Sequence, residues 1–165
     1  MSAPGSGQRV GHRVEASRFV PVESVLAYDR LIATPLPEIF SRRFAAFPAI
    51  REVADQEGAW GTVGQTRTIV LADGGSLRET LTEVDRPRSY SYVLDEIQGA
   101  MRPFVRTVDG TWSVTPHGDG SLVGWTWTLH AKRSPARLTH NVIGRMWKGY
   151  ADKALTELET ILARG

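Results

Sequence analysis

The chain has 165 residues with 20 basic and 18 acidic side chains, so its formal net charge is only +2. This length favours one domain, and so weak a charge surplus argues against nucleic acid as a partner. The absence of cysteine excludes disulfides, thiolate metal sites, iron–sulfur clusters and a cysteine nucleophile. Five tryptophans are the one unusual count, because each is a large aromatic surface that must be buried or used.

The first residues carry no targeting signal. Residues 1–11 are mostly small and polar, which predicts a disordered tail and neither a signal peptide nor a membrane span. No stretch of the sequence approaches about 18 consecutive apolar residues, so no transmembrane segment is expected. We therefore expect a single domain over residues 12–165, in a cytoplasmic protein.

Short elements come first along the chain. Weak alternation predicts a strand over residues 13–20, followed by a short helix over residues 22–31. Three prolines within residues 35–48 divide the next segment into one or two further short helices. Another strand is predicted over residues 50–55.

The middle of the chain reads as an antiparallel meander. Turn signals such as Asp73-Gly74-Gly75 and His117-Gly118-Asp119-Gly120 separate short runs of β-branched and aromatic residues. The predicted strands cover residues 62–71, 76–84, 89–97, 104–108, 111–115 and 121–131.

Alternation along these strands assigns their faces, since successive side chains point to opposite sides of a sheet. The last strand places Trp125 and Trp127 on one apolar side. Arg67 and Glu79 fall on the apolar sides of two strands joined by a hairpin, which departs from a purely apolar inner face. Tyr90, Tyr92, Leu94 and Glu96 share one side of their strand, unless Asp95-Glu96 opens a bulge.

The C-terminal third predicts one long amphipathic helix. Ser134 is a good N-cap and Pro135 suits the first helical position. Apolar residues then recur every three or four positions as far as Leu162. A helix of about 29 residues would be roughly 43 Å long, and its single apolar stripe needs a broad apolar surface to cover it. Gly144 and Gly149 interrupt this helix and indicate either close packing on the sheet or a hinge near a ligand.

The order of strand, short helices, meander and long helix resembles the helix-grip (SRPBCC, START-like) superfamily, which includes birch-pollen-allergen-like and polyketide-cyclase-like proteins. The stretches that carry the resemblance are Gly64-Gln65-Thr66-Arg67, Asp85-Arg86-Pro87, Tyr90-Ser91-Tyr92 and Gly118-Asp119-Gly120-Ser121, which are similar to bacterial polyketide cyclase/dehydrase-like sequences. The resemblance implies an α+β helix-grip fold, with a curved antiparallel sheet of about six to seven strands wrapped around the long C-terminal helix. It also implies a cavity between sheet and helix that binds a hydrophobic ligand.

Within that resemblance, the aromatic residues become candidates for a pocket lining, with core filling as the alternative for each one taken singly. Arg67, Glu79 and Tyr92 are candidate polar contacts in the same pocket. The residues expected to bind the ligand are Trp60, Arg67, Glu79, Tyr92, Phe104, Trp112, Trp125, Trp127, Trp147 and Tyr150.

The roles of Arg67 and Glu79 stay open at this point. A charge left alone in an apolar interior is costly, so the two should pair or contact water. They form either a buried ion pair that fixes the fold, or a ligand contact in which Arg67 holds an oxygen and Glu79 orients it or acts as a base. We expect Arg67→Ala to lower ligand affinity more than it lowers melting temperature, and a loss of stability with binding intact would exclude the ligand role.

Conventional catalytic patterns are missing from the sequence. The catalytic candidates are therefore the cavity residues Arg67, Glu79, Tyr92 and Glu96. The four histidines are expected to be solvent-exposed, and none has metal-ligand spacing to another, so neither a metal nor a cofactor is expected.

Three functions remain possible from the sequence. The first is binding of a hydrophobic small molecule such as a lipid, polyketide or aromatic compound. The second is a cyclase, aromatase or dehydratase that uses the same cavity. The third is a protein-interaction module, and the chain is expected to be a monomer or a homodimer. Both small-molecule functions need room for a ligand of about a dozen heavy atoms.

Overall fold

The computed structural model describes residues 11–131 and 137–164. The predicted tail up to residue 10 and the predicted helix start at Ser134-Pro135 lie outside these residues. Seven strands form one antiparallel sheet in the order β1-β7-β6-β5-β4-β3-β2. The strands are β1 (His12–Val20), β2 (Ile50–Ala54), β3 (Thr66–Leu71), β4 (Ser76–Asp85), β5 (Ser89–Gln98), β6 (Val105–His117) and β7 (Gly120–Ala131).

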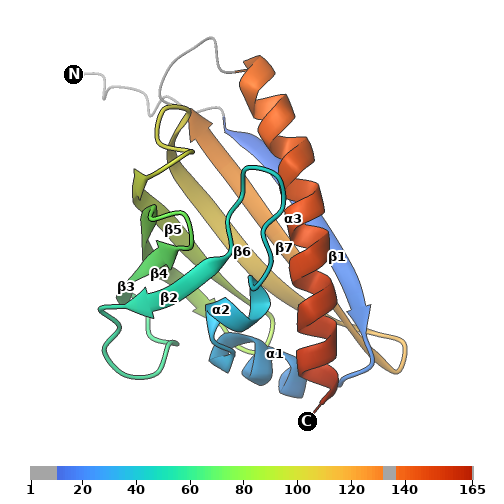
Figure 1. The fold of residues 1–165 in the computed structure, drawn as a ribbon. Coiled ribbons are helices and arrows are strands. Elements are labelled where there is room, and N and C mark those ends of the chain that lie inside the picture. Colours follow the sequence, from blue (N-terminus) through green and yellow to red (C-terminus); the bar gives the residue numbers. More distant parts are fainter. Residues whose placement is uncertain (1–10, 132–136, 165) are drawn as a thin grey trace, which may run out of the picture.

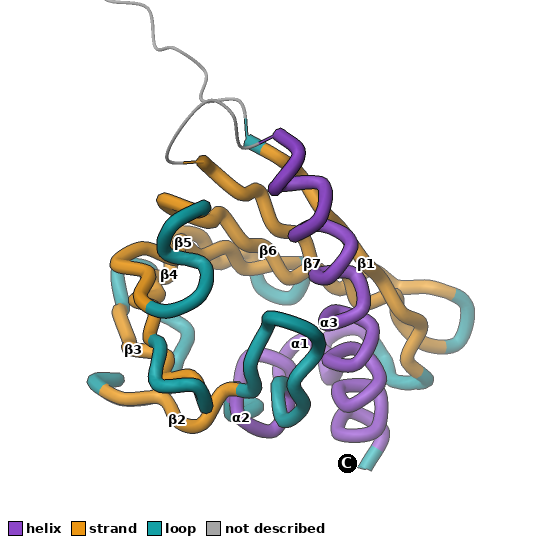
Figure 2. The backbone as a smooth tube through the Cα atoms, turned by 45° about the horizontal axis from the view of Figure 1, so that its top comes forward, coloured by secondary structure: helices purple, strands orange, loops and turns teal. Residues whose placement is uncertain are grey.

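In the described part of the chain, three helices lie against this sheet. The short helices α1 (Ser24–Ala33) and α2 (Leu36–Ile39) connect β1 to β2, and the long helix α3 (Arg137–Ala163) ends the described chain. The sheet curves, and α3 lies across its inner side with α1 and α2 near the C-terminal end of that helix (Figures 1 and 2). The predicted α+β helix-grip fold is confirmed. Among the described residues, no helix is both long and apolar enough to span a membrane.

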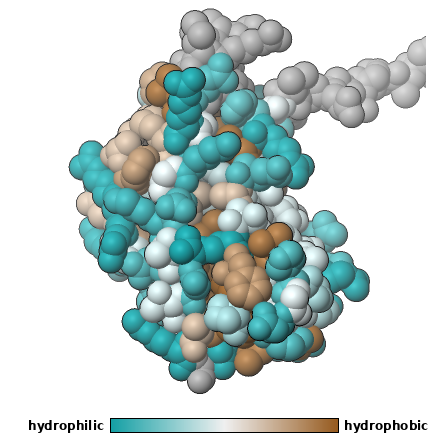
Figure 3. Space-filling view, turned by 90° about the vertical axis from the view of Figure 1, so that its right-hand side faces the viewer, coloured by the Kyte–Doolittle hydropathy of each residue, from teal (hydrophilic) through white to brown (hydrophobic). Residues whose placement is uncertain are grey.

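The side of the molecule formed by β1 and α3 is mostly hydrophilic, with only small apolar patches (Figure 3). The apolar stripe of α3 faces the sheet instead, where Trp147, Ala151 and Leu158 are fully buried. Gly149 permits one close contact on this helix, since a Cβ there would lie 2.2 Å from the Phe44 ring. Gly144 likewise packs closely on β1, beside His12 and Val14. Gly144 therefore has the predicted close packing on the sheet, whereas Gly149 packs on Phe44, which lies outside the sheet.

Strand β6 is longer than predicted. The sequence suggested two strands separated at Asp109-Gly110, but one continuous strand pairs with β5 and β7 through both residues. The predicted break is wrong because Gly110 is not a turn residue here. A Cβ at Gly110 would lie 2.1 Å from the Tyr92 ring, so the glycine leaves space for that side chain.

A bulge near the end of β5 reverses one predicted face. The register shifts where Glu96 and Ile97 together oppose Leu77, and Glu96 has a positive φ of 49°. As a result, Ile97 is buried while Glu96 is exposed and pairs with Arg78 at 3.3 Å. Glu96 therefore does not share the inward side of Tyr92 and Leu94.

Candidate functional site

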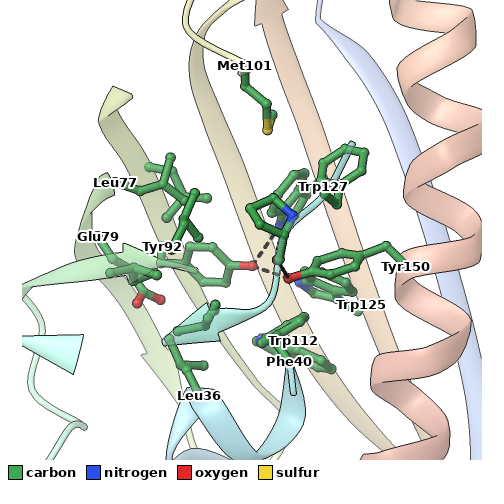
Figure 4. Close-up of a pocket in the computed structure, with 16 residues that line it drawn as sticks. Leu36, Phe40, Leu77, Glu79, Tyr92, Met101, Trp112, Trp125, Trp127 and Tyr150 are labelled. Carbon is green, nitrogen blue, oxygen red and sulfur yellow. Dashed lines mark hydrogen bonds between the residues drawn. The ribbon is translucent and has the colours of Figure 1, made fainter. Parts of the chain in front are cut away.

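An apolar pocket lies between the sheet and α3. Its walls come from strands β3 to β7, from Tyr150 on α3, and from the segment between Leu36 and Ile50 (Figure 4). Met101, in the connection from β5 to β6, extends toward it from one side. Among the lining residues that the structure describes, Glu79 is the one that carries a charge.

The pocket is narrow. It encloses about 60 Å³ that a water-sized molecule can reach, within about 550 Å³ of space that holds no atoms, open solvent included. The smaller volume has room for only a few water molecules, whereas ligand pockets usually measure roughly 300–1,000 Å³. A ligand of about a dozen heavy atoms therefore does not fit while the side chains lie as they do here.

Four tryptophans form one continuous cluster along the inner side of β6, β7 and α3. Trp112 and Trp125 are stacked with 5.0 Å between ring centroids, and Trp125 lies edge-on to Trp127 at 5.3 Å. Trp147 packs 4.8 Å from Trp125. Trp112, Trp125 and Trp127 line the pocket, whereas Trp147 lies behind them, fully buried in the core.

Tyr92 extends from β5 toward β7 inside this pocket (Figure 4). Tyr92 pairs with Gly110 on β6, and Gly110 in turn pairs with Trp127 on β7, so the three residues form one row across the sheet. Because Gly110 has no side chain, the tyrosine ring crosses β6. Its hydroxyl oxygen accepts hydrogen bonds from Trp125 Nε1 at 2.7 Å and Trp127 Nε1 at 2.9 Å. Burial raises the pKa of Tyr92, and the nearby Glu79 charge raises it further.

Arg67 and Glu79 form a buried ion pair. Arg67 Nε donates to Glu79 Oε2 at 2.6 Å, and the two residues are 7% and 3% exposed. The guanidinium also donates to Gln56 Oε1 at 3.2 Å and lies 3.9 Å from the Trp60 ring centroid. Burial raises the pKa of Glu79 above its ordinary value, and Arg67 offsets part of this rise. This is the geometry of a buried ion pair that fixes the fold, one of the two roles that the sequence left open for Arg67 and Glu79.

A second pocket of about 460 Å³ lies on the other side of this ion pair. It is lined by the connection between α1 and α2, by β2, and by Trp60 and Arg67. Leu36 lines both pockets, while Glu79 lines only the first. Trp60 and Arg67 therefore belong to the outer pocket and not to the tryptophan-lined one.

Of the residues predicted to bind ligand, some line the inner pocket and others lie outside it. The inner pocket brings together Glu79, Tyr92, Trp112, Trp125, Trp127 and Tyr150. Two expectations are corrected. Phe104, a predicted ligand contact, is 43% exposed and lies outside the pocket lining. The bulge directs Glu96, a catalytic candidate, to solvent. Whether the pocket residues bind a ligand stays a prediction.

Sequence reasoning missed one wall of the pocket. Phe40, Phe47 and Pro48 line it from an irregular segment that has no periodicity to assign a face. Phe47 stacks on Tyr150 with 5.3 Å between centroids, and Tyr150 Oη donates to the Pro48 carbonyl at 3.0 Å. The available signal was the cluster of phenylalanines among prolines, which is unusual for an exposed loop.

No group of three potential metal ligands occurs in the part of the chain that the structure describes. His130 is less exposed than predicted, because its Nε2 lies 2.6 Å from Asp109 Oδ2 across the β6–β7 pair and only 16% of its side chain is exposed. The expectation that His130 is solvent-exposed is therefore wrong.

Comparison with known proteins agrees with this architecture. Ara h 8.0201, seen in a crystal structure, is 17% identical with a TM-score of 0.67, covering 94% of this chain and 99% of that chain. The ginseng major latex-like protein 151 from Panax ginseng is 13% identical with a TM-score of 0.68, covering 92% and 97%. XoxI from Bacillus cereus is 18% identical with a TM-score of 0.64, covering 92% and 95%. These structures share the fold.

No curated protein sequence matches the chain. A family model described as polyketide cyclase/dehydrase and lipid transport matches residues 11–163, almost the whole chain. The resemblance drawn from the strand, turn and helix pattern is confirmed by this match together with the fold. The chain belongs to the polyketide cyclase/dehydrase and lipid transport family, within the helix-grip superfamily.

Proposed function

We propose that the protein binds a hydrophobic small molecule, such as an aromatic, polyketide or lipid compound, in the pocket between the sheet and α3. The observation that carries the proposal is the composition of that pocket, in which three tryptophans and several aliphatic residues surround the polar groups of Tyr92, Tyr150 and Glu79. Apolar walls with a few placed polar groups are typical of small-molecule sites. The family description, which includes lipid transport, supports the same function.

Binding without catalysis is the better supported function because Glu79 already has a partner. A general base must lie within hydrogen-bond reach of the proton that it removes. Glu79 instead accepts a 2.6 Å hydrogen bond from Arg67 and is almost completely buried. A cyclase or dehydratase that used Glu79 as a base would have to do so with one oxygen of the carboxylate held by Arg67, or break the pair first.

The narrowness of the pocket means that its walls must move when a ligand of ordinary size binds. The segment between Phe40 and Pro48 is the wall that we expect to move, since it lies outside the sheet and packs on α3 through Phe44, Phe47 and Pro48. A displacement there would widen the inner pocket without breaking strand pairing.

Native mass spectrometry of freshly purified protein tests the proposal directly. We expect a co-purified or added aromatic compound to appear as a bound mass that solvent extraction removes. Met101→Trp should reduce binding by filling the pocket from the β5–β6 connection. Leu26→Trp is the matched control, because Leu26 is 44% exposed on α1 and lies outside the pocket lining.

Two results would contradict the proposal. One is the absence of any bound mass after exposure to a panel of aromatic, polyketide and lipid compounds. The other is binding that Met101→Trp and Leu26→Trp reduce equally, since the ligand would then lie outside this pocket.

A further inference from the structure

The Tyr92 hydroxyl can form a hydrogen bond with a ligand only as a donor, because its oxygen already accepts two hydrogen bonds from the protein. A phenolic hydroxyl has one hydrogen to donate and lone pairs that accept. Trp125 Nε1 and Trp127 Nε1 both donate to its oxygen, at 2.7 and 2.9 Å. Indole nitrogens donate only, so these bonds cannot reverse. The accepting capacity of Tyr92 is therefore filled by the protein.

The hydrogen of the same hydroxyl has no acceptor among the described residues. Burial makes an unused donor costly, at roughly 1–3 kcal/mol. The Tyr92 ring is 5% exposed and lines the inner pocket, so a molecule in that pocket is the available acceptor. Figure 4 shows the hydroxyl at the middle of the pocket, among the aromatic side chains.

The position of this donor is fixed before any ligand enters. The ring crosses β6 over Gly110, where any Cβ would collide with it, and the two indole N–H groups hold its oxygen from β7. A donor held in place by neighbouring groups binds its acceptor with little further loss of entropy. Tyr92 is thus placed to select ligands by the position of one oxygen atom.

The surroundings favour a neutral oxygen over an anionic one. Glu79 lines the same pocket and the rest of the lining is uncharged, so a carboxylate would lose its hydration without gaining a cation there. Arg67, the nearest candidate cation, is paired with Glu79 and lines the outer pocket. A ketone or quinone oxygen matches a neutral donor in an apolar pocket.

We propose that Tyr92 donates a hydrogen bond to the carbonyl oxygen of an aromatic ketone or quinone and so selects this class over plain hydrocarbons. This inference rests on the proposed function, because it names the chemistry of the ligand that the same pocket binds. It makes Tyr92 a specificity-determining residue.

The test compares two probes of nearly equal shape, 9-fluorenone and fluorene, which differ in one carbonyl oxygen. We expect the wild-type protein to bind fluorenone about five- to tenfold more tightly, as one neutral hydrogen bond allows. Tyr92→Phe should remove this preference, chiefly by weakening fluorenone binding. Tyr28→Phe is the control, since Tyr28 lies outside the pocket lining, and it should keep the preference.

Tyr92→Phe leaves two buried indole N–H groups without an acceptor and can lower stability. A second measurement therefore uses the wild-type protein alone. The carbonyl stretching band of fluorenone bound to the wild-type protein should lie at lower frequency than in an alkane solvent. Equal affinities for the two probes, or an unshifted band, would overturn the inference while leaving the proposed function intact. If neither probe nor any other apolar compound binds, the proposed function fails and this inference fails with it.

Discussion

Gly110 and Tyr92 fit each other across two neighbouring strands. They are directly paired between β5 and β6, and a Cβ on Gly110 would lie 2.1 Å from Cζ of the Tyr92 ring. The missing side chain lets the ring reach Trp125 and Trp127 on the next strand. A glycine that resembled a turn residue in the sequence is thus what positions the polar centre of the pocket.

Gly110→Ala should therefore destabilise the protein strongly. The added methyl group must displace the Tyr92 ring and break its bonds to the indoles, with an expected loss of about 2–4 kcal/mol in the free energy of unfolding. Urea unfolding followed by tryptophan fluorescence measures this loss. Gly61→Ala is the control, because no atom lies within 4 Å of the added Cβ, and it should be close to neutral. Equal stability of the two variants would show that the ring is not constrained by Gly110.

Arg67→Ala should lower stability more than it lowers ligand binding, the reverse of the order expected for a ligand contact. The substitution leaves the carboxylate of Glu79 buried without its partner, which typically costs about 3–5 kcal/mol. Replacing both residues, as in Arg67→Met with Glu79→Leu, should restore much of the loss because no charge is then left alone. Chemical unfolding of both variants measures the difference. A stable Arg67→Ala protein that no longer binds ligand would assign Arg67 to the ligand instead.

Glu79 should make stability depend on pH. Its pKa in the folded protein is raised above 4.5 by burial, so the folded state takes up a proton at higher pH than the unfolded chain. The contribution of Glu79 to the free energy of unfolding is therefore fully present below pH 4.5. It is lost as the pH rises from 4.5 through the raised pKa of the folded protein. Urea unfolding across this range should show the trend in the wild type and its loss in Glu79→Gln. The same pH slope in both proteins would exclude Glu79 as its source.

Tyr150→Phe should loosen the wall formed by residues 40–48. It removes the bond to the Pro48 carbonyl, with an expected loss of about 1 kcal/mol. Hydrogen exchange should become faster at the amides of Phe44 and Phe47, which bond to each other's carbonyls within this segment. Tyr28→Phe is a suitable comparison, because its hydroxyl makes only a long 3.4 Å bond to the Ser89 carbonyl. Unchanged exchange in Tyr150→Phe would mean that other contacts hold the wall.

Local patterns in the sequence determined most of the architecture. The three- and four-residue spacing of apolar side chains defines α3, and the turn signals define the hairpins of the sheet. Alternation alone placed Trp125, Trp127, Arg67 and Glu79 on the inner side, where the structure has them. These features were predictable because helix and strand periods depend only on neighbouring residues.

The site itself was decided by contacts between distant parts of the chain. The bulge in β5 moves Glu96 to solvent, and the fit of Tyr92 over Gly110 depends on the register of three strands. Phe47 and Pro48 become a pocket wall only because they pack on Tyr150 of α3, about a hundred residues away. A cavity is the volume that packing leaves unfilled, so its lining and its size follow from the tertiary structure and not from the period of any one element.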